Sequence, residues 1–416
     1  MLLTYNNMES EVRSYSRHFP VTFDRAEGSY LYTDDGRKFL DFFCAAGSLN
    51  YGHNPTQLVE PLVAYLRKNR VINSLDMRTT AKRDFLEAFA EIILKPRNMN
   101  YVVQFPGPTG TNAIEAALKL ARMCTGRRHI AAFTNGFHGM TLGALAVTGN
   151  AENRAAAVTA LADVIRVPYE NYQSGCDGLA LIEAMIDDPS SGIDAPAAFV
   201  VEVVQGEGGL RAASFNWLQR LQALARRCGS LLIIDDIQAG CGRTGSFFSF
   251  EPAGIDPDII CLSKSIGGIG LPMSLVLFRR ELDVWKPGQH NGTFRGNNLA
   301  FVAASAALDV FWRDSIFTDR IKVLSNSIES ILQRFAMRYQ SLGLEPRGRG
   351  LMRGLAFADP AKAASVAADC FDHGLICERC GPYDEVLKFL PALTIEESDL
   401  IAGFSKIEKS LERAAV

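Results

Sequence analysis

The sequence lacks the features that mark exported, membrane-spanning or nucleic-acid-binding proteins. Residues 1–19 (MLLTYNNMESEVRSYSRHF) contain no long apolar run, so they do not resemble a secretory signal. No apolar run elsewhere approaches the length of a membrane span. The formal net charge is -3 without a block of basic residues, which argues against a nucleic-acid footprint. We therefore expect neither a membrane nor a nucleic acid as a partner.

Histidines and paired cysteines are also scarce. The six histidines are dispersed, and the nine cysteines are scattered through a long chain, a pattern typical of reduced thiols in the cytoplasm. Cys377 and Cys380 form a C-x-x-C motif, but no second cysteine pair or histidine cluster supplies the other ligands of a zinc site. We predict a cytoplasmic protein that binds no metal.

Internal repeats, low-complexity tracts and a dinucleotide fingerprint are missing as well. No convincing G-x-G-x-x-G motif follows a first strand with an acid about twenty residues further on, which argues against a dinucleotide-binding oxidoreductase. What remains is an ordinary globular composition, 48% hydrophobic and 21% charged. The 416 residues suffice for two domains, or for one large domain with a sizeable core.

Short apolar runs alternate with helical patterns between about residues 101 and 278. This alternation predicts a mostly parallel α/β sheet. Such runs can also belong to buried helices, but their length and β-branched content favour strands. The runs that we interpret as buried strands are 129–133, 198–201, 231–234 and 259–262.

The two ends of the chain show other patterns. An alternating segment turns at Asp34-Asp35-Gly36, which predicts a hairpin. Helices are expected over about 57–70 and 80–94, and a polar loop over 286–298. Short strands and helices after residue 346 predict a small α+β domain. We predict an N-terminal segment (1–55) that belongs with the C-terminal small domain (311–416), and a large domain between them (56–310).

Two of the apolar runs end in chemically useful residues. Asp235 follows the run 231–234, and Lys264 follows the run 259–262 after one serine. Open α/β sheets bind ligands outside the carboxyl ends of their strands, so adjacent strands would bring this acid and amine to one edge. Pyridoxal phosphate needs a lysine to hold its aldehyde and an acid to pair with its pyridine nitrogen. Partial burial would help the lysine lose its proton and act as a nucleophile.

Residues 104–112 (QFPGPTGTN) predict a phosphate site. They lead into a helix whose apolar residues recur at helical spacing, and Thr111 or Asn112 can cap its start. Free backbone N–H groups at a helix start, with glycine allowing close approach, bind anions. A capped helix, a surface lysine after a strand or an aspartate that caps a turn is commonly structural when it occurs alone. Only the combination of these motifs therefore indicates a function.

In combination, these motifs resemble a class III pyridoxal phosphate-dependent aminotransferase, and the resemblance extends over nearly the whole chain. It implies an α/β fold of the type I, aspartate aminotransferase-like kind, with a large mostly parallel-sheet domain and a smaller α+β domain. It also implies pyridoxal 5'-phosphate as cofactor and a homodimer with active sites at the interface. The motifs that carry it are, in chain order, Thr109-Gly110-Thr111, Phe137-His138-Gly139, residues 202–209, Asp235-Asp236-Ile237-Gln238, Ser263-Lys264 and Thr293-Phe294.

Within that family the sequence is most similar to the diaminobutyrate–2-oxoglutarate aminotransferases of the ectoine-pathway type. Two segments that carry this likeness are FPGPTGTN (105–112) and WKPGQHNGTFRGNN (285–298). The likeness implies an exchange of an amino group between L-glutamate/2-oxoglutarate and aspartate 4-semialdehyde/L-2,4-diaminobutyrate.

The resemblance also implies roles for single residues. Lys264 would carry the cofactor covalently and move the substrate proton, and Asp235 would pair with the pyridinium nitrogen. Ile237 and Phe137 would pack on the two faces of the ring, and Thr293 would reach the cofactor phosphate of the partner subunit. The cofactor-binding positions are Thr109, Gly110, Thr111, Phe137, His138, Glu202, Asp235, Ile237, Gln238, Lys264 and Thr293, with Gly110 and Thr111 at the phosphate and Gln238 at the 3-hydroxyl side.

The expected substrate contacts depart from the wider family. Glu207 lies where relatives keep a glutamate that gates the substrate's carboxylate site. Met140 and Lys388 stand where many relatives have arginines that bind a dicarboxylate. Lysine is a point charge without the bidentate fork of arginine, so the carboxylate of 2-oxoglutarate needs another arrangement. Arg295 is a candidate for a substitute carboxylate contact.

Other functions remain open at this point. Another ω-aminotransferase, acting on ornithine, 4-aminobutyrate or a natural-product amine, shares every cofactor residue, although Met140 and the quoted segments argue against it. An aminomutase uses the same fold and lysine, and would turn over one substrate without an added 2-oxo acid. A non-catalytic binding protein is disfavoured because Lys264 and Asp235 are both present.

Overall fold

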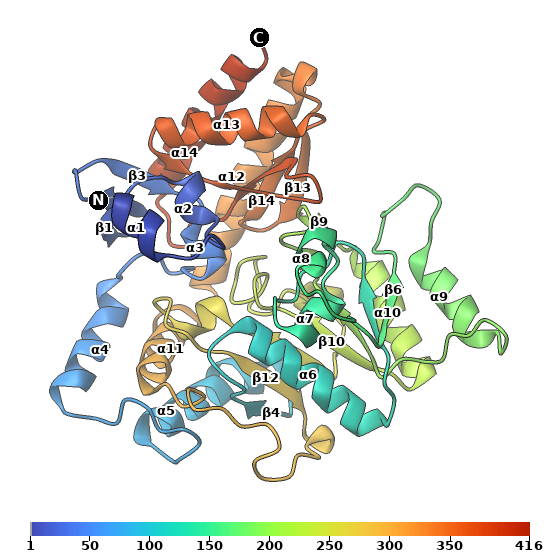
Figure 1. The fold of residues 1–416 in the computed structure, drawn as a ribbon. Helices are drawn as coiled ribbons and strands as arrows, with labels where there is room; N and C mark the ends of the chain where they lie inside the picture. The colour runs from blue at the N-terminus through green and yellow to red at the C-terminus, as the bar shows by residue number, and fades with distance from the viewer. Residues whose placement is uncertain (1) are drawn as a thin grey trace.

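The centre of the fold is a seven-stranded sheet in the lower half of Figure 1. The structure, a computed structural model, describes residues 2–416. Only β12 runs antiparallel to its neighbours in this sheet, so the mostly parallel sheet that the sequence predicts is confirmed. The strands, in spatial order, are β4 (Tyr101–Gln104), β12 (Leu275–Arg279), β11 (Ile259–Leu262), β10 (Leu231–Asp235), β7 (Ala198–Val201), β5 (Ile130–Phe133) and β6 (Val164–Val167).

Helices cover both faces of this sheet. Successive strand residues point to opposite faces, so Ile233 joins one core while Leu232 and Ile234 join the other. Burial on both faces explains why the strands read as continuous apolar runs. Among residues 2–416, no helix is both long and apolar enough to cross a membrane. The helices of this region are α4 (Thr56–Arg67), α5 (Thr80–Phe89), α6 (Gly110–Thr125), α7 (Leu142–Val147), α8 (Ala151–Ala155), α9 (Gly178–Asp187), α10 (Phe215–Cys228) and α11 (Asn298–Phe311).

The two ends of the chain meet in the upper half of Figure 1. The N-terminal strands β1 (Phe23–Glu27), β2 (Tyr30–Thr33) and β3 (Lys38–Asp41) form one sheet with β15 (Leu375–Ile376), so residues near both termini share a sheet. The boundaries between the predicted domains stay predictions. The other elements here are α1 (Leu2–Met8), α2 (Tyr15–His18), α12 (Ile316–Arg338), α13 (Pro360–Asp372), α14 (Glu397–Ala414) and the sheet of β13 (Glu345–Arg349), β14 (Met352–Ala356), β17 (Val386–Phe389) and β16 (Glu378–Cys380).

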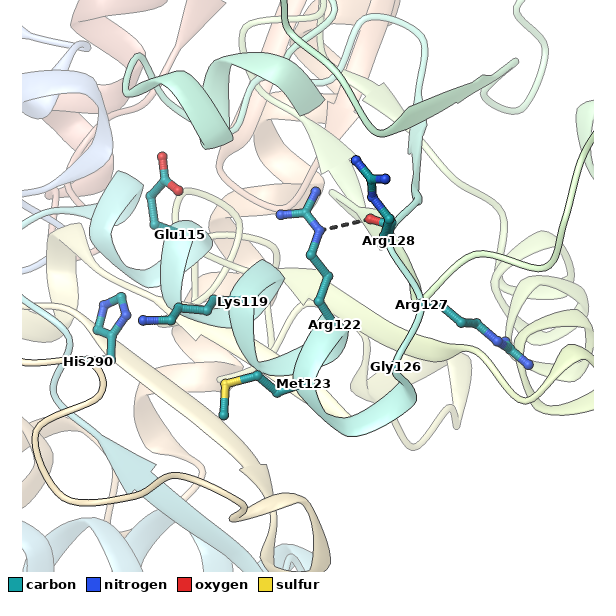
Figure 2. A pocket seen from close by; sticks show the side chains of 8 residues that line it. All are labelled: Glu115, Lys119, Arg122, Met123, Gly126, Arg127, Arg128 and His290. Carbon is teal, nitrogen blue, oxygen red and sulfur yellow. Dashed lines mark hydrogen bonds between the residues drawn. The ribbon is translucent and has the colours of Figure 1, made fainter.

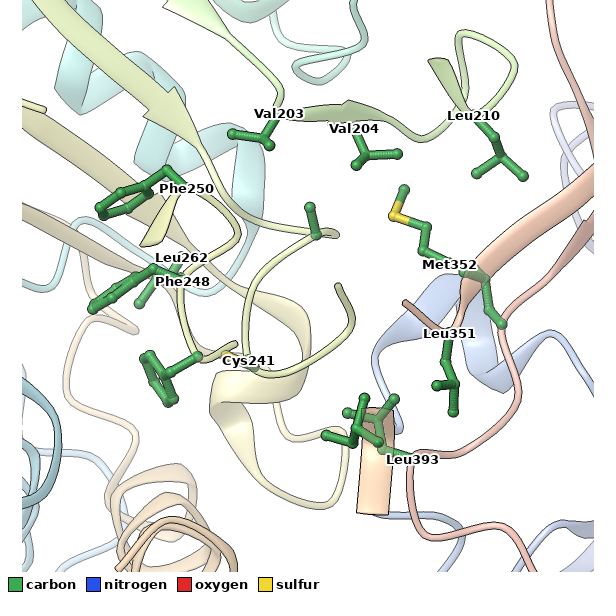
Figure 3. Close-up of a cluster of buried hydrophobic side chains, with 14 of the residues drawn as sticks. Val203, Val204, Leu210, Cys241, Phe248, Phe250, Leu262, Leu351, Met352 and Leu393 are labelled. Atoms are coloured by element: carbon green, nitrogen blue, oxygen red, sulfur yellow. The ribbon is translucent and has the colours of Figure 1, made fainter. Parts of the chain in front are cut away.

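One hydrophobic cluster continues from the large sheet into the C-terminal region. Figure 3 shows Val204 and Leu210 facing Met352 of β14, with Phe248 on the side of the large sheet. All four side chains are buried. Apolar packing therefore joins the C-terminal sheet to the segments that follow the central strands, where the candidate site lies.

One local expectation is wrong, and another is confirmed with a change of helix type. Helix α6 begins after Thr109, whose backbone and hydroxyl both bond Asn112 in a capping box, rather than after Thr111 or Asn112. The helix expected over 80–94 is present: α5 ends at Phe89, and a wider π turn continues it over Ala90–Leu94. The error at α6 concerns a helix start, where side-chain capping decides the boundary.

Candidate active site

The acid and the amine singled out in the sequence come from neighbouring strands of the large sheet. Strands β10 and β11 are parallel, Asp235 pairs with Cys261, and Lys264 follows β11 in a 3₁₀ turn. Asp235 is buried and Lys264 is partly buried. Burial lowers the pKa of Lys264, although the carboxylate of Glu207 opposes this effect. The amine therefore loses its proton more readily than a surface lysine, as a nucleophile or proton carrier requires.

Strained backbone occurs beside this amine. Lys264 has a φ of 53°, in the left-handed region that non-glycine residues rarely adopt. Residues 44–46 also have positive φ, and the Ala46 carbonyl accepts a hydrogen bond from Gln238 Nε2 at 3.1 Å. Strained backbone of this kind persists where the surrounding structure enforces it, commonly at functional sites.

Asp235 is held by a buried polar network. His138 Nδ1 lies 2.6 Å from Asp235 Oδ2, and Asp235 Oδ1 accepts from the Ile237 N–H. Burial lowers the pKa of His138, but the hydrogen bond and charge of Asp235, with the charge of Glu202, outweigh it and raise the pKa. The carboxylate of Glu202 accepts from the Phe137 and Gly206 N–H groups, and burial raises its pKa to about 7. The network fixes the orientation of Asp235.

The start of α6 lies against the residues that follow β10. A Cβ added at Gly110 would lie 3.0 Å from Ile237 Cδ1, so any larger residue here would require the Ile237 side chain to shift. Thr111 Oγ1 lies 2.7 Å from Thr141 Oγ1. The first N–H groups of a helix have no partner within it, so this end of α6 offers donors to an anion.

A second charged group lies beside Gln238. The Lys388 ammonium is fully buried and lies 2.8 Å from Glu207 Oε1 and 2.9 Å from Glu378 Oε1. Gln238 Nε2 donates to the same Glu207 oxygen, and the Tyr15 hydroxyl donates to Glu378 Oε2 at 3.4 Å. Burial alone would lower the pKa of Lys388, but the two carboxylates raise it well above its usual value. Burial raises the pKa of Glu378 to about 7.

The sequence reasoning missed Glu378 and Tyr15. Glu378 stands directly opposite Lys388 in the antiparallel pair of β16 and β17. Glu378 lies inside the C-x-x-C segment, where only the cysteines suggested a function. Pairing the two short C-terminal strands in register would have placed it opposite Lys388. For Tyr15, which approaches from the N-terminal segment, the sequence carries no comparable signal.

The structure brings most predicted site residues together, but not all of them. Phe137 follows β5 beside the Asp235 network, through its bond to Glu202. Thr293 is exposed on the loop before α11. Arg295 lies on the same loop, where it donates to the His290 carbonyl and to Asn291 Oδ1. Neither Thr293 nor Arg295 contacts the groups around Lys264 within this chain.

A shallow basic hollow of about 590 Å³ lies elsewhere, along α6. Figure 2 shows Lys119 and Arg122 on that helix, with His290 on the neighbouring loop. Its donors already have partners: Lys119 Nζ donates to the Gln289 carbonyl and Arg122 Nε to the Arg128 carbonyl. The hollow is therefore a surface feature separate from the Asp235–Lys264 site.

Within the described part of the chain, no group of three or more His, Cys, Asp or Glu side chains is placed to hold a metal ion. Cys377 and Cys380 are buried free thiols in the C-terminal region.

Comparison with known proteins decides the family. The family model of class III aminotransferases matches residues 12–411. The chain belongs to the class III aminotransferases. Among the similar relatives, the diaminobutyrate–2-oxoglutarate transaminase of Virgibacillus pantothenticus is 52% identical over 408 residues, covering 98% of each chain. The enzyme of that name from Vibrio cholerae serotype O1 is 54% identical over 407 residues, covering 98% of this chain and 99% of the relative.

Solved structures of aminotransferases share the fold of this class III aminotransferase. The ornithine aminotransferase of Toxoplasma gondii ME49 superposes with a TM-score of 0.86 at 25% identity, covering 99% of this chain and 94% of that one. An S-selective transaminase from Arthrobacter sp. superposes with a TM-score of 0.87 at 21% identity, covering 99% and 97%. The predicted type I fold is confirmed.

Membership of this family implies pyridoxal phosphate as cofactor, and the residues present fit that group. The site offers a partly buried amine with a lowered pKa, a buried carboxylate fixed by His138, and a helix start that lies against Ile237. The amine matches the aldehyde of the cofactor, the carboxylate matches its pyridine nitrogen, and the helix start matches its phosphate. The cofactor, when bound, supplies an electrophilic aldehyde and an electron-accepting ring.

Proposed function

We propose that this class III aminotransferase exchanges an amino group between L-glutamate/2-oxoglutarate and aspartate 4-semialdehyde/L-2,4-diaminobutyrate. The observation that carries the chemistry is the pairing of Lys264 and Asp235 at the ends of adjacent strands. The substrate assignment is supported by full-length relatives of 52% and 54% identity, which are named for this activity.

In this proposal the residues of the site have separate roles. Lys264 holds the cofactor and carries the proton that leaves the substrate carbon, a task that its lowered pKa favours. Asp235, oriented by His138, places a negative charge where the ring nitrogen binds. Gly110 and Thr111, at the start of α6, would hold the phosphate. The two faces of the ring are assigned to Ile237 and Phe137, and the remaining contacts to Thr109, His138, Glu202 and Gln238.

The substrate end of the site is assigned to Glu207 and Lys388. Both belong to the charged group beside Gln238, and the side chain of Glu207 is about a third exposed while that of Lys388 is fully buried. Glu207 is therefore the member that a substrate meets first. Arg295 remains a candidate carboxylate contact, contributed from the exposed loop before α11.

We further propose a homodimer in which Thr293 reaches the phosphate site of the partner subunit. The loop of Thr293 is bonded to the segment 71–77, since Ser74 N donates to Gly296 O and Asn298 N to Ile72 O. These two segments carry a group of large exposed apolar side chains, which is typical of a surface that another protein covers. They are Val71, Ile72, Leu75, Met77 and Phe294. The nine free cysteines support a cytoplasmic location.

A spectrum of the loaded enzyme tests the reaction and its substrate. Adding L-2,4-diaminobutyrate is expected to remove the visible band of the lysine-bound cofactor, and 2-oxoglutarate is expected to restore it. Ornithine and 4-aminobutyrate serve as matched controls. Bleaching by a control amine instead would keep the chemistry and overturn the substrate. Turnover of one substrate without any 2-oxo acid would indicate an aminomutase.

The dimer is tested by placing a charge on the exposed loop. Phe294→Asp is expected to give monomers and a loss of most activity, because a buried unpaired carboxylate opposes association. Sedimentation velocity measures the change. Val323→Asp, an equally drastic change at an exposed position on α12, is expected to leave the size unchanged. A wild-type protein that sediments as a monomer would contradict the proposed assembly.

A further inference from the structure

The charged group around Lys388 holds more negative than positive charge. One ammonium, Lys388, lies between two carboxylates, those of Glu207 and Glu378. The side chain of Glu378 is 6% exposed and that of Lys388 is fully buried. Burying two carboxylates beside a single cation is costly, unless a second positive charge neutralises the remaining negative charge. With Glu378 ionised, the group therefore lacks one positive charge.

The same group has more hydrogen-bond acceptors than donors. Glu378 Oε1 lies 2.9 Å from the Lys388 ammonium, the same cation that Glu207 Oε1 approaches at 2.8 Å. Gln238 Oε1 is buried and has no donor among the described residues, although its amide nitrogen bonds Glu207 and Ala46. Buried acceptors that lack donors are costly and point to a missing partner. An ammonium group, with three N–H donors, suits them.

The charged group is open to a ligand at Glu207. The charges of Glu207, Lys388 and Glu378 all act on the Lys264 amine, so the four groups share one region. Glu207 is about a third exposed, which leaves its carboxylate open to a ligand. Lys264 itself offers a positive charge only while its amine is free and protonated. The lowered pKa of that amine makes it an incomplete counter-charge for the two carboxylates.

We propose that Glu378 and Glu207 bind the second ammonium group of a diamino acid substrate, with Gln238 Oε1 as a further acceptor. The inference rests on the proposed function and extends it, because it identifies Glu378 as a residue that determines specificity. Lys388 then serves chiefly to hold the two carboxylates in place. The site would prefer an amino acid with two amino groups over one of equal length with a single amino group.

Two pairs of ligands test this preference. L-2,4-Diaminobutyrate and 4-aminobutyrate differ only in the second amino group, and so do L-ornithine and 5-aminovalerate. We expect the wild-type enzyme to bind the diamino member of a pair about tenfold more tightly, as a charge-assisted hydrogen bond allows. Glu378→Gln is expected to reduce this ratio to about twofold or less. Spectral titration of the loaded enzyme gives the half-reaction constants, and calorimetry on a Lys264→Ala background gives binding without turnover.

A matched control lies on the same hairpin. Glu385 is a carboxylate between β16 and β17 that approaches Arg347 rather than Lys388. Glu385→Gln removes an equal charge nearby and is expected to keep the wild-type ratio. Glu378→Asp retains the charge on a shorter side chain and is expected to keep part of the ratio. A ratio that is the same in Glu378→Gln as in the wild type would overturn the proposal.

The pH dependence of the ratio provides a further test. Glu378 faces Lys388, Glu207, the Tyr15 hydroxyl and Lys264, and burial raises its pKa to about 7. Its carboxylate is therefore charged above pH 7 and takes up a proton below it. We expect the wild-type ratio to fall several-fold between pH 8 and pH 6, and the ratio in Glu378→Gln to stay flat. A flat wild-type ratio would contradict a role for this carboxylate.

The second ligand pair separates this proposal from the assignment of the substrate. If ornithine rather than diaminobutyrate reacts, the proposed function fails, but the ratio between ornithine and 5-aminovalerate still tests Glu378. If diaminobutyrate reacts and its preference over 4-aminobutyrate survives Glu378→Gln, the proposed function stands and this inference fails.

Discussion

Lys264→Ala is expected to reduce turnover by at least about 10³-fold and to remove the visible band of the covalently held cofactor. Alanine lacks the amine that bonds the cofactor aldehyde and that carries the substrate proton. The methyl group keeps the Cβ, so the strain of the left-handed backbone at this position is unchanged. The loss is thus attributable to the amine and not to a relaxed turn.

Two controls separate chemistry from folding. Lys264→Arg retains the positive charge but not a group that can lose its proton, so it is expected to be as inactive as Lys264→Ala. The melting temperature of cofactor-free Lys264→Ala is expected to match or exceed that of the wild type, because a lysine with a pKa lowered by burial costs stability. A small primary amine added to Lys264→Ala is expected to restore part of the turnover. Normal turnover in Lys264→Ala would refute the assignment of this residue.

The central sheet could be predicted from the sequence because its signal is local. Buried parallel strands read as continuous apolar runs, and the two runs before Asp235 and Lys264 correspond to β10 and β11. Their adjacency required one further rule, that ligands bind at the carboxyl ends of such strands. The hairpin at Asp34-Asp35-Gly36 was predictable for the same reason, since turn chemistry lies within a few residues.

Glu378 could not be predicted in this way because its role depends on distant contacts. It meets Lys388 through a strand register and Tyr15 through the N-terminal segment, and it shares the Lys388 ammonium with Glu207, about 170 residues earlier. Nothing in the residues around it distinguishes it from an ordinary strand glutamate. The role proposed for Thr293 requires the proposed partner subunit, whose contacts the sequence of one chain does not display.

Asp235→Asn is expected to lower kcat by about 10²- to 10³-fold, the second largest effect that we predict. Asparagine keeps the shape of the side chain and its acceptor oxygen, but it removes the negative charge that would stabilise a protonated ring nitrogen. An electrostatic contact that is preorganised in a buried site contributes more than the same contact in water, because the surroundings need no rearrangement. The affinity for the cofactor is expected to fall as well, and equilibrium dialysis of pyridoxal phosphate measures it.

His138 supplies a readout that does not depend on activity. Burial lowers its pKa, and the hydrogen bond and charge of Asp235 are the main effects that raise it again. In Asp235→Asn the burial effect is expected to dominate, so the pKa of His138 falls, and NMR titration of the imidazole reports the change. A pKa of His138 that stays at its wild-type value would contradict the proposed coupling.

The neighbouring carboxylate provides the matched control for Asp235→Asn. Asp236 is fully buried, its Oδ2 accepts from the Ser249 N–H at 3.0 Å, and burial raises its pKa to about 7. Asp236→Asn keeps that acceptor and removes a charge that is already half neutralised near pH 7. It is expected to leave kcat within about threefold of the wild type, since a neutral hydrogen bond replaces a similar one. Equal losses in the two variants would show that the site needs negative charge in general rather than the carboxylate of Asp235, and would remove its assignment to the ring nitrogen.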